Sequence, residues 1–143
     1  LHTNTAAGAI TRLQDLGVDS FLLASTIRGI LSQRLLRKLC HHCRQPVEPN
    51  EFNRDLLKLE VGHKIYEAAG CEKCNSTGYA GRQALFELVS VDAQLQTLIH
   101  ENAGEIELES KIREDVPSIR EAGFSLVRDG MTTIEEVLRV TSV

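Results

Sequence analysis

The chain has 143 residues, of which 42% are hydrophobic and 25% charged, with a formal net charge of −4. This length and composition are typical of a soluble globular protein that forms one domain or two small ones. The negative charge, the low aromatic content of 4% and the lack of Trp argue against nucleic-acid binding. The apolar runs are too short to cross a bilayer, and we expect no signal peptide.

Two short helices are predicted at the start of the chain. The first follows a polar cap near Thr5, ends at Gly17 and has apolar residues at helical spacing, namely Ala6, Ile10, Leu13 and Leu16. The second begins at Asp19 or Ser20, and its apolar set is Leu22, Leu23, Ile27, Ile30 and Leu31. Residues 33–39 can finish that helix or form a strand, and we favour a strand.

Two C-x-x-C pairs follow, Cys40–Cys43 and Cys71–Cys74, and they use all four cysteines of the chain. Each such turn brings two thiolates to one centre, so two turns complete the four-thiolate shell of a structural zinc site. Two disulfides or thioredoxin-like redox pairs are the alternatives. We expect His41 and His42 to be exposed polar residues rather than substitute ligands. Because no leader is expected, the thiols are interpreted as cytosolic and reduced.

A basic stretch precedes and enters this region, with Arg34, Arg37, Lys38 and Arg44 and no acidic residue between Leu31 and Val47. We interpret it as a solvated rim of the metal site rather than a phosphate contact. Between the cysteine pairs, Asn50 is expected to cap a short helix with Phe52, Leu56 and Leu57 that covers one side of the zinc. Residues 82–91 predict a strand that buries Leu85, Leu88 and Val89 and pairs with 33–39 as a stem.

The rest of the chain is predicted to be helical and acidic, with ten acidic and five basic residues from Glu101 to Val143. Asp92 caps a helix to His100, and a second helix carries Ile106, Leu108 and Ile112. A third begins at Pro117 or Ser118, carries Ile119, Phe124 and Leu126, and is stopped by Gly130. Thr132-x-x-Glu135 and Thr133-x-x-Glu136 are capping-box candidates for a last helix.

The order of several motifs resembles the secretion ATPases of type II secretion and type IV pilus assembly, and most closely those of type II secretion. The motifs are Leu1-His2-Thr3-Asn4-Thr5-Ala6, Arg12-Leu13, Gly17-Val18, Gln33-Arg34-Leu35, the two Cys pairs, Gly78-Tyr79-x-Gly81-Arg82 and Glu87. The ending Pro117-Ser118-Ile119-Arg120, Gly130 and Glu135-Glu136-Val137 completes the resemblance. The chain begins without Met, and we expect it to be the C-terminal fragment of such a protein.

The resemblance implies a mixed α/β, mostly helical fold with three parts. These are the end of a RecA-like P-loop domain at 1–38, a tetracysteine zinc-binding subdomain at 39–80, and a returning strand plus helical C-terminal subdomain at 81–143. It also implies a homo-hexamer in the cytoplasm of a Gram-negative bacterium, held peripherally at the inner membrane by the secretion platform proteins and not bound to nucleic acid. Its ATP hydrolysis would drive a pseudopilus that exports folded proteins. His2 would lie near the ATP γ-phosphate.

The chain departs from that family in the motifs that bind and hydrolyse ATP. The chain has no G-x-x-x-x-G-K-[ST] motif and no acidic Walker B segment after a strand, so the phosphate cradle and the magnesium site are missing. ATP and Mg²⁺ would be bound in the full-length protein only, and this chain alone should not hydrolyse ATP. A free-standing zinc-ribbon module that binds nucleic acid or protein, and a C-x-x-C redox protein, are the competing interpretations.

Overall fold

The computed structural model describes Thr3 and residues 5–142, which divide into two compact units. Unit 1 comprises the described residues up to Gln33 together with Phe86–Ser118. Unit 2 comprises Arg34–Leu85 and Ile119–Ser142. Neither unit is continuous in the sequence, because strands β1 (Gly29–Leu39) and β4 (Tyr79–Ser90), which pair as a two-stranded sheet, each contribute to both units.

Unit 1 holds four helices: α1 (Ala6–Asp15), α2 (Ser20–Thr26), α4 (Ala93–His100) and α5 (Glu105–Asp115). Their apolar faces meet in one core, because α1 packs on α5 and α2 packs on α4. Thr5, Asp19 and Asp92 cap α1, α2 and α4 with their side-chain oxygens, as the sequence predicts. The core residues with the lowest exposure include Ala6, Ala7, Ile10, Ile99 and Leu108.

The second predicted helix is shorter than expected. It ends at Thr26, and Ile30 and Leu31 belong to β1 instead. The backbone is already extended at Ile27, and the carbonyl of Arg28 accepts a hydrogen bond from the Val91 N–H (3.0 Å). Strand pairing therefore replaces the helix from this point, and Ile30 contacts the core of unit 1 from a strand.

Strand alternation also corrects the expected burial of β4. Leu85, Glu87 and Val89 are buried, whereas Leu88 is exposed, because alternate residues of a strand share one face. The buried carboxylate of Glu87 is held by Arg113 of α5, whose Nη2 lies 2.8 Å from Glu87 Oε1. Ile106 of α5, expected on the apolar face, is 88% exposed.

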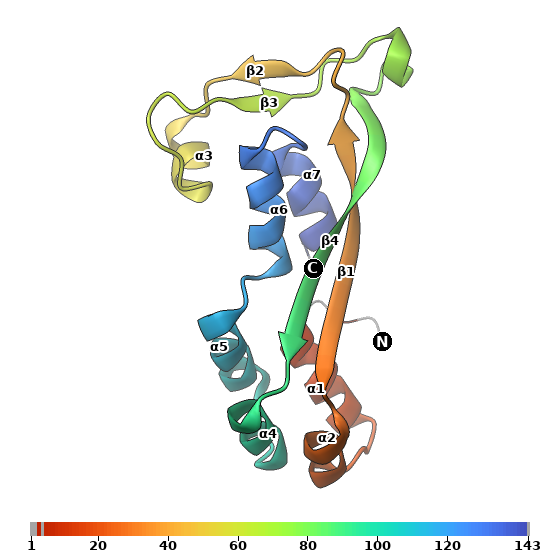
Figure 1. Ribbon diagram of the computed structural model, residues 1–143, viewed down its shortest axis with the longest axis vertical. Coiled ribbons are helices and arrows are strands. Elements are labelled where there is room, and N and C mark those ends of the chain that lie inside the picture. Colours follow the sequence, from red (N-terminus) through yellow and green to blue (C-terminus); the bar gives the residue numbers. More distant parts are fainter. Residues whose placement is uncertain (1–2, 4, 143) are drawn as a thin grey trace. The chain divides into compact units, whose positions relative to one another are not determined.

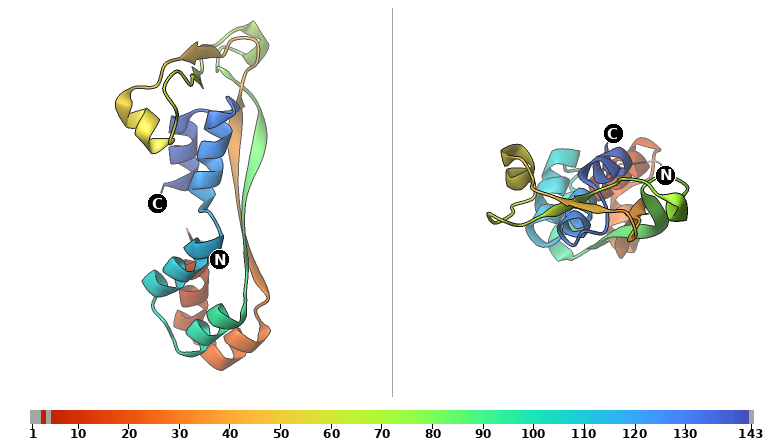
Figure 2. Two further views of the ribbon diagram at one scale, coloured as in Figure 1. Left: turned by 60° about the vertical axis from the view of Figure 1, so that its left-hand side comes forward. Right: turned by 90° about the horizontal axis from the view of Figure 1, so that it is seen from above.

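Unit 2 combines the other parts of β1 and β4 with β2 (Gln45–Val47), α3 (Glu51–Leu56), β3 (Ile65–Glu67), the 3₁₀ turn η1 (Glu72–Cys74), α6 (Ile119–Arg128) and α7 (Ile134–Thr141). Figures 1 and 2 show α6 and α7 side by side. Their apolar faces and the strands enclose a core that includes Leu36, Leu85, Phe124, Val127 and Val137.

Helix α3 does not cover the cysteines. β2 and β3 form an antiparallel ribbon in which Gln45 pairs with Glu67 and Val47 with Ile65. The cysteine turns adjoin the Gln45 end of this ribbon, whereas α3 follows Val47 at the other end (Figure 1). There Leu57 is buried in the unit 2 core, and its carbonyl accepts a hydrogen bond from Arg128 Nη1 (3.1 Å).

The mixed α/β class and the stem of two paired strands are confirmed. The division at residues 38/39 and 80/81, and the RecA-like origin of the first part, stay predictions.

Candidate metal centre

The four cysteine sulfurs converge in unit 2. Cys40 follows the last residue of β1, Cys43 precedes β2, Cys71 precedes the η1 turn, and Cys74 is the last residue of that turn. Their Sγ atoms all lie within 4.8 Å of one another, and the four thiols are free of disulfides. This is the single cluster of at least three metal-ligating side chains that the described part of the chain contains.

The sulfur separations fit a tetrahedral ion. The Sγ atoms of Cys40 and Cys71 lie 3.9 Å apart, those of Cys43 and Cys74 3.8 Å, and those of Cys71 and Cys74 3.8 Å. Four thiolates that bind Zn²⁺ at about 2.3 Å in tetrahedral geometry have S···S separations of about 3.8 Å. The arrangement can therefore hold such an ion with little rearrangement.

Two strand pairings bring the cysteine turns together. The β2–β3 ribbon joins the chain just after Cys43 to the chain just before Cys71. At the other side, the Cys40 N–H donates to the carbonyl of Gly78 (2.9 Å), four residues after Cys74. In each C-x-x-C turn, one cysteine thus lies next to each of the two strand pairings. These pairings bring the two turns together although 27 residues separate them in the sequence.

Backbone N–H groups point at two of the sulfurs. Gly70 donates to Cys43 Sγ (3.3 Å), while Cys71 and Gly78 both donate to Cys74 Sγ (3.2 Å each). Burial disfavours the Cys74 thiolate, but the N–H groups of Cys71 and Gly78 outweigh it and lower the pKa of Cys74 to about 6. Burial raises the pKa of Cys43 by more than its one such hydrogen bond, from the Gly70 N–H, lowers it. The pKa of Cys43 is therefore raised to about 11.

Gly78 cannot be replaced without disturbing this site. Its φ of +79° lies in the left-handed region, and a Cβ there would lie 2.5 Å from Ala68 Cβ. The residue is needed in this conformation because its N–H faces Cys74 and its carbonyl faces Cys40.

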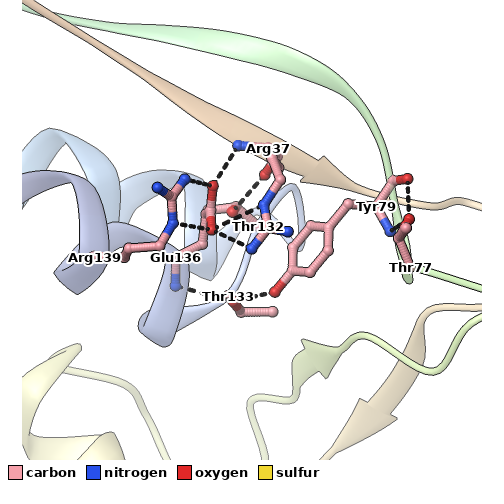
Figure 3. A network of polar contacts seen from close by, with 7 residues as sticks. All are labelled: Arg37, Thr77, Tyr79, Thr132, Thr133, Glu136 and Arg139. Carbon is pink, nitrogen blue, oxygen red and sulfur yellow. Dashed lines mark hydrogen bonds and ion pairs between the residues drawn. The ribbon is translucent and has the colours of Figure 1, made fainter.

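A buried carboxylate ties the end of β1, the strand that precedes Cys40, to α7 (Figure 3). The Glu136 side chain has no solvent exposure, and it accepts from the Arg37 N–H (2.8 Å), Arg37 Nη2 (2.8 Å) and Arg139 Nη2 (2.6 Å). Burial disfavours this carboxylate, but the hydrogen bonds from Arg139 and Arg37 outweigh it and lower the pKa of Glu136 to about 2.

Further contacts join the same strand ends to the turn before α7. Thr132 Oγ1 donates to the Arg37 carbonyl (2.8 Å), and the Leu39 N–H donates to the Met131 carbonyl (2.8 Å). The hydroxyls of Tyr79 and Thr133 lie 2.9 Å apart (Figure 3). We call this set the clamp; its residues are Arg37, Leu39, Tyr79, Met131, Thr132, Thr133, Glu136 and Arg139. It holds the residues that precede Cys40 and follow Cys74.

Two arginines of the expected basic rim make specific contacts in unit 2, although the Arg37 side chain stays 48% exposed. Arg37 pairs with Glu136 and stacks over the Tyr79 ring at 4.2 Å, and Arg44 Nη1 donates to the Gly130 carbonyl (2.5 Å) while its guanidinium lies over Tyr66. The Thr133-x-x-Glu136 capping box forms one of its two expected hydrogen bonds. Thr133 Oγ1 accepts from the Glu136 N–H (3.2 Å), but the carboxylate turns to the arginines.

The other candidate residues fall outside the centre. His41 and His42 are exposed and do not belong to the metal-ligating cluster. His2, expected near a nucleotide phosphate, lies outside the described residues. Sequence reasoning missed Glu136 as a site residue, although the neighbouring apolar positions Ile134 and Val137 already mark the buried side of that helix.

The fold and the tetracysteine cluster define an α/β chain with a candidate metal site, and comparison with known proteins places it in a family. The model of the family described as "Type II/IV secretion system protein" matches residues 1–139. The chain is 50% identical over 143 residues to the type II secretion system ATPase E of Vibrio cholerae. It is 46% identical to the type II secretion system protein E of Aeromonas hydrophila and 45% identical to that of Pseudomonas aeruginosa.

The chain therefore belongs to the type II/IV secretion system protein family, which confirms the resemblance drawn from its motifs. Each of these alignments covers 99% of this chain but 28% of the relative. The chain thus spans a little over a quarter of the length of these relatives. Among the described residues, no helix is both long and apolar enough to cross a bilayer.

Proposed function

We propose that this chain serves as the zinc-stabilised part of a hexameric ATPase that powers type II secretion through pseudopilus assembly. The observation that carries the proposal is the 50% identity, along the whole chain, to a protein named type II secretion system ATPase E. In this proposal residues 1–38 complete a RecA-like domain, 39–80 form the zinc subdomain, and 81–143 form the returning strand and helical end.

The chemistry of the four thiolates suits a structural role for the metal. Zn²⁺ bound by four cysteines has no open position for water or substrate, so it organises the chain rather than taking part in a reaction. ATP and Mg²⁺ would be bound by residues that this sequence does not contain. The protein is proposed to work in the cytoplasm, held at the inner membrane through the platform proteins of the secretion system.

Elemental analysis tests the metal. We expect one zinc per chain in protein purified under reducing conditions, and in thiol titration the cysteines should react faster after chelation than before it. A metal-free chain with reactive thiols or disulfides would support the redox interpretation instead.

A chimera tests the secretion role. This chain would replace the matching 28% of the Vibrio cholerae protein in a strain that lacks its own ATPase E. We expect export of type II substrates to resume. The control is the same chimera with Cys40 and Cys74 changed to Ser. If the intact chimera accumulates normally and hydrolyses ATP without export, the proposed role in secretion is wrong.

The chimera also tests His2. Because one histidine can at most polarise or sense the γ-phosphate, His2→Ala should leave nucleotide binding nearly unchanged while kcat falls strongly. Steady-state kinetics and nucleotide titration distinguish the two effects. A wild-type kcat in the His2→Ala chimera would show that His2 has no part in catalysis. The resemblance at the N-terminus would then indicate a shared fold only.

A further inference from the structure

The four cysteines differ in their access to solvent. Cys40 is 1% exposed and Cys74 is 5% exposed, whereas Cys43 and Cys71 are half-buried. Each C-x-x-C turn therefore contributes one buried cysteine and one half-buried cysteine. The two half-buried cysteines come from different turns, and their sulfurs lie within 4.8 Å of each other.

The enclosed pair is covered by the backbone at Gly78. This residue is itself buried, its carbonyl accepts from the Cys40 N–H, and its N–H donates to Cys74 Sγ. A second N–H, from Cys71, also points at Cys74 Sγ. Two backbone N–H groups and the buried Gly78 therefore cover the Cys74 sulfur.

The residues around the other pair leave it open. His41 and His42, which precede Cys43, are exposed, and so are Glu72 and Lys73, which follow Cys71. One N–H, that of Gly70, donates to Cys43. A reagent that must approach a sulfur from outside therefore meets Cys43 and Cys71 first.

We propose that Cys43 and Cys71 are a modification site, at which soft electrophiles alkylate the protein and thereby eject its metal. With a haloacetamide, the thiolate attacks the carbon, an S–C bond forms, the C–I bond breaks and iodide leaves. The product is a neutral thioether, so the metal loses an anionic ligand at each alkylated residue. Metal ejection rests on the zinc site of the proposed function, whereas the order of alkylation follows from exposure alone.

Limited labelling of the intact chain with iodoacetamide tests the order. Trypsin cuts after Lys73, so Cys71 lies in peptide 65–73 and Cys74 in peptide 74–82. Cys40 and Cys43 share peptide 39–44 and are distinguished by fragmentation. We expect about tenfold more label on Cys43 and on Cys71 than on Cys40 or Cys74. The denatured chain is the control, in which the four cysteines should label alike.

Zinc release, followed with a chromogenic indicator in the same reaction, tests the consequence. We expect release to rise in parallel with the label on Cys43 and Cys71. Equal or greater label on Cys40 or Cys74 in the folded chain would overturn the proposed order. Label in the expected order with zinc fully retained would overturn the ejection step. A chain that never contained zinc refutes the metal assignment instead, and the order of labelling is still measured in it.

Discussion

The two units of this protein are stabilised in different ways. Unit 1 has a core of eleven buried residues, nine from the facing sides of helices and two, Val89 and Val91, from the end of β4 and the residue after it. Its capping residues close three of the helix starts. In unit 2, the 39-residue excursion from Cys40 to Gly78 places only Leu57 and Ile65 among the buried residues of the core that the structure describes there. That excursion depends on the cysteine cluster and the clamp, because apolar burial there is too small to offset the conformational entropy of ordering it.

The chain provides a probe for each side of this comparison. It has no Trp, and its two tyrosines, Tyr66 and Tyr79, both lie in unit 2. Tyrosine emission therefore reports unit 2, while far-UV circular dichroism reports the helices of both units. Different transitions by the two probes would mean that the units unfold separately.

The largest expected effect comes from Cys71→Ser. Removing one ligand should abolish zinc binding and unfold residues 40–75, because in such sites the free energy of metal binding is folding free energy. Hydrogen exchange should show lost protection there and retained protection in α1, α2, α4 and α5. Equal loss in both units would mean a single cooperative core and would contradict the comparison.

Ile99→Ala should destabilise unit 1 and leave unit 2 unchanged. Ile99 is fully buried in unit 1, and the cavity should cost about 2–5 kcal/mol of unfolding free energy. We expect the circular dichroism transition to shift while zinc content and the tyrosine transition stay the same. Ile106→Ala is the matched control, because Ile106 is in the same unit but exposed, and its change should cost less than about 0.5 kcal/mol.

Acid should weaken unit 2 through Glu136. Its pKa is lowered from 4.5 to about 2 by folding, so its stabilisation is complete above pH 4.5 and is lost as the pH falls towards 2. The full loss corresponds to about 3 kcal/mol, since one pKa unit is about 1.4 kcal/mol.

Urea titrations followed by tyrosine emission measure this at neutral pH and near pH 3. Thiolate protonation releases zinc in the same range, so the comparison is made with Glu136→Gln. Zinc loss affects both proteins, and the difference between their pH dependences isolates the carboxylate. An identical pH dependence in the two proteins would show that the clamp does not depend on the charge of Glu136.

The smallest expected effect is that of Thr133→Ala. This side chain caps α7 and contacts the Tyr79 hydroxyl, so its loss should cost about 1 kcal/mol. Thr133→Ser keeps the hydroxyl and should restore most of that stability. Unit 1 should not respond to either change, and a shift of its transition would argue against separate units.

Local patterns predicted the local structure well. The caps at Thr5, Asp19 and Asp92, the stem strands and the gathering of four cysteines follow from short-range chemistry, which the sequence displays directly. Leu88, expected to be buried, is exposed because it lies on the opposite face of the strand from Leu85, Glu87 and Val89.

The clamp could not be predicted in the same way. Arg37 and Glu136 are 99 residues apart, and nothing local indicates that a charge in a basic stretch pairs with a charge in an acidic helix. The place of α3 has a similar cause. It depends on the register of the β2–β3 ribbon, whose strands are only three residues long and carry a weak pattern.

The discontinuity of unit 2 has a consequence for the order in which the protein folds as it is synthesised. The four cysteines have all left the ribosome once residue 74 has emerged, and 27 residues separate the two pairs, a loop whose closure costs little. The clamp needs Glu136, which emerges 62 residues after Cys74, so it forms after the cysteines can meet. We therefore expect the nascent chain to bind metal before α6 and α7 exist, so that these two helices dock onto a metal-bound cysteine cluster that is already complete.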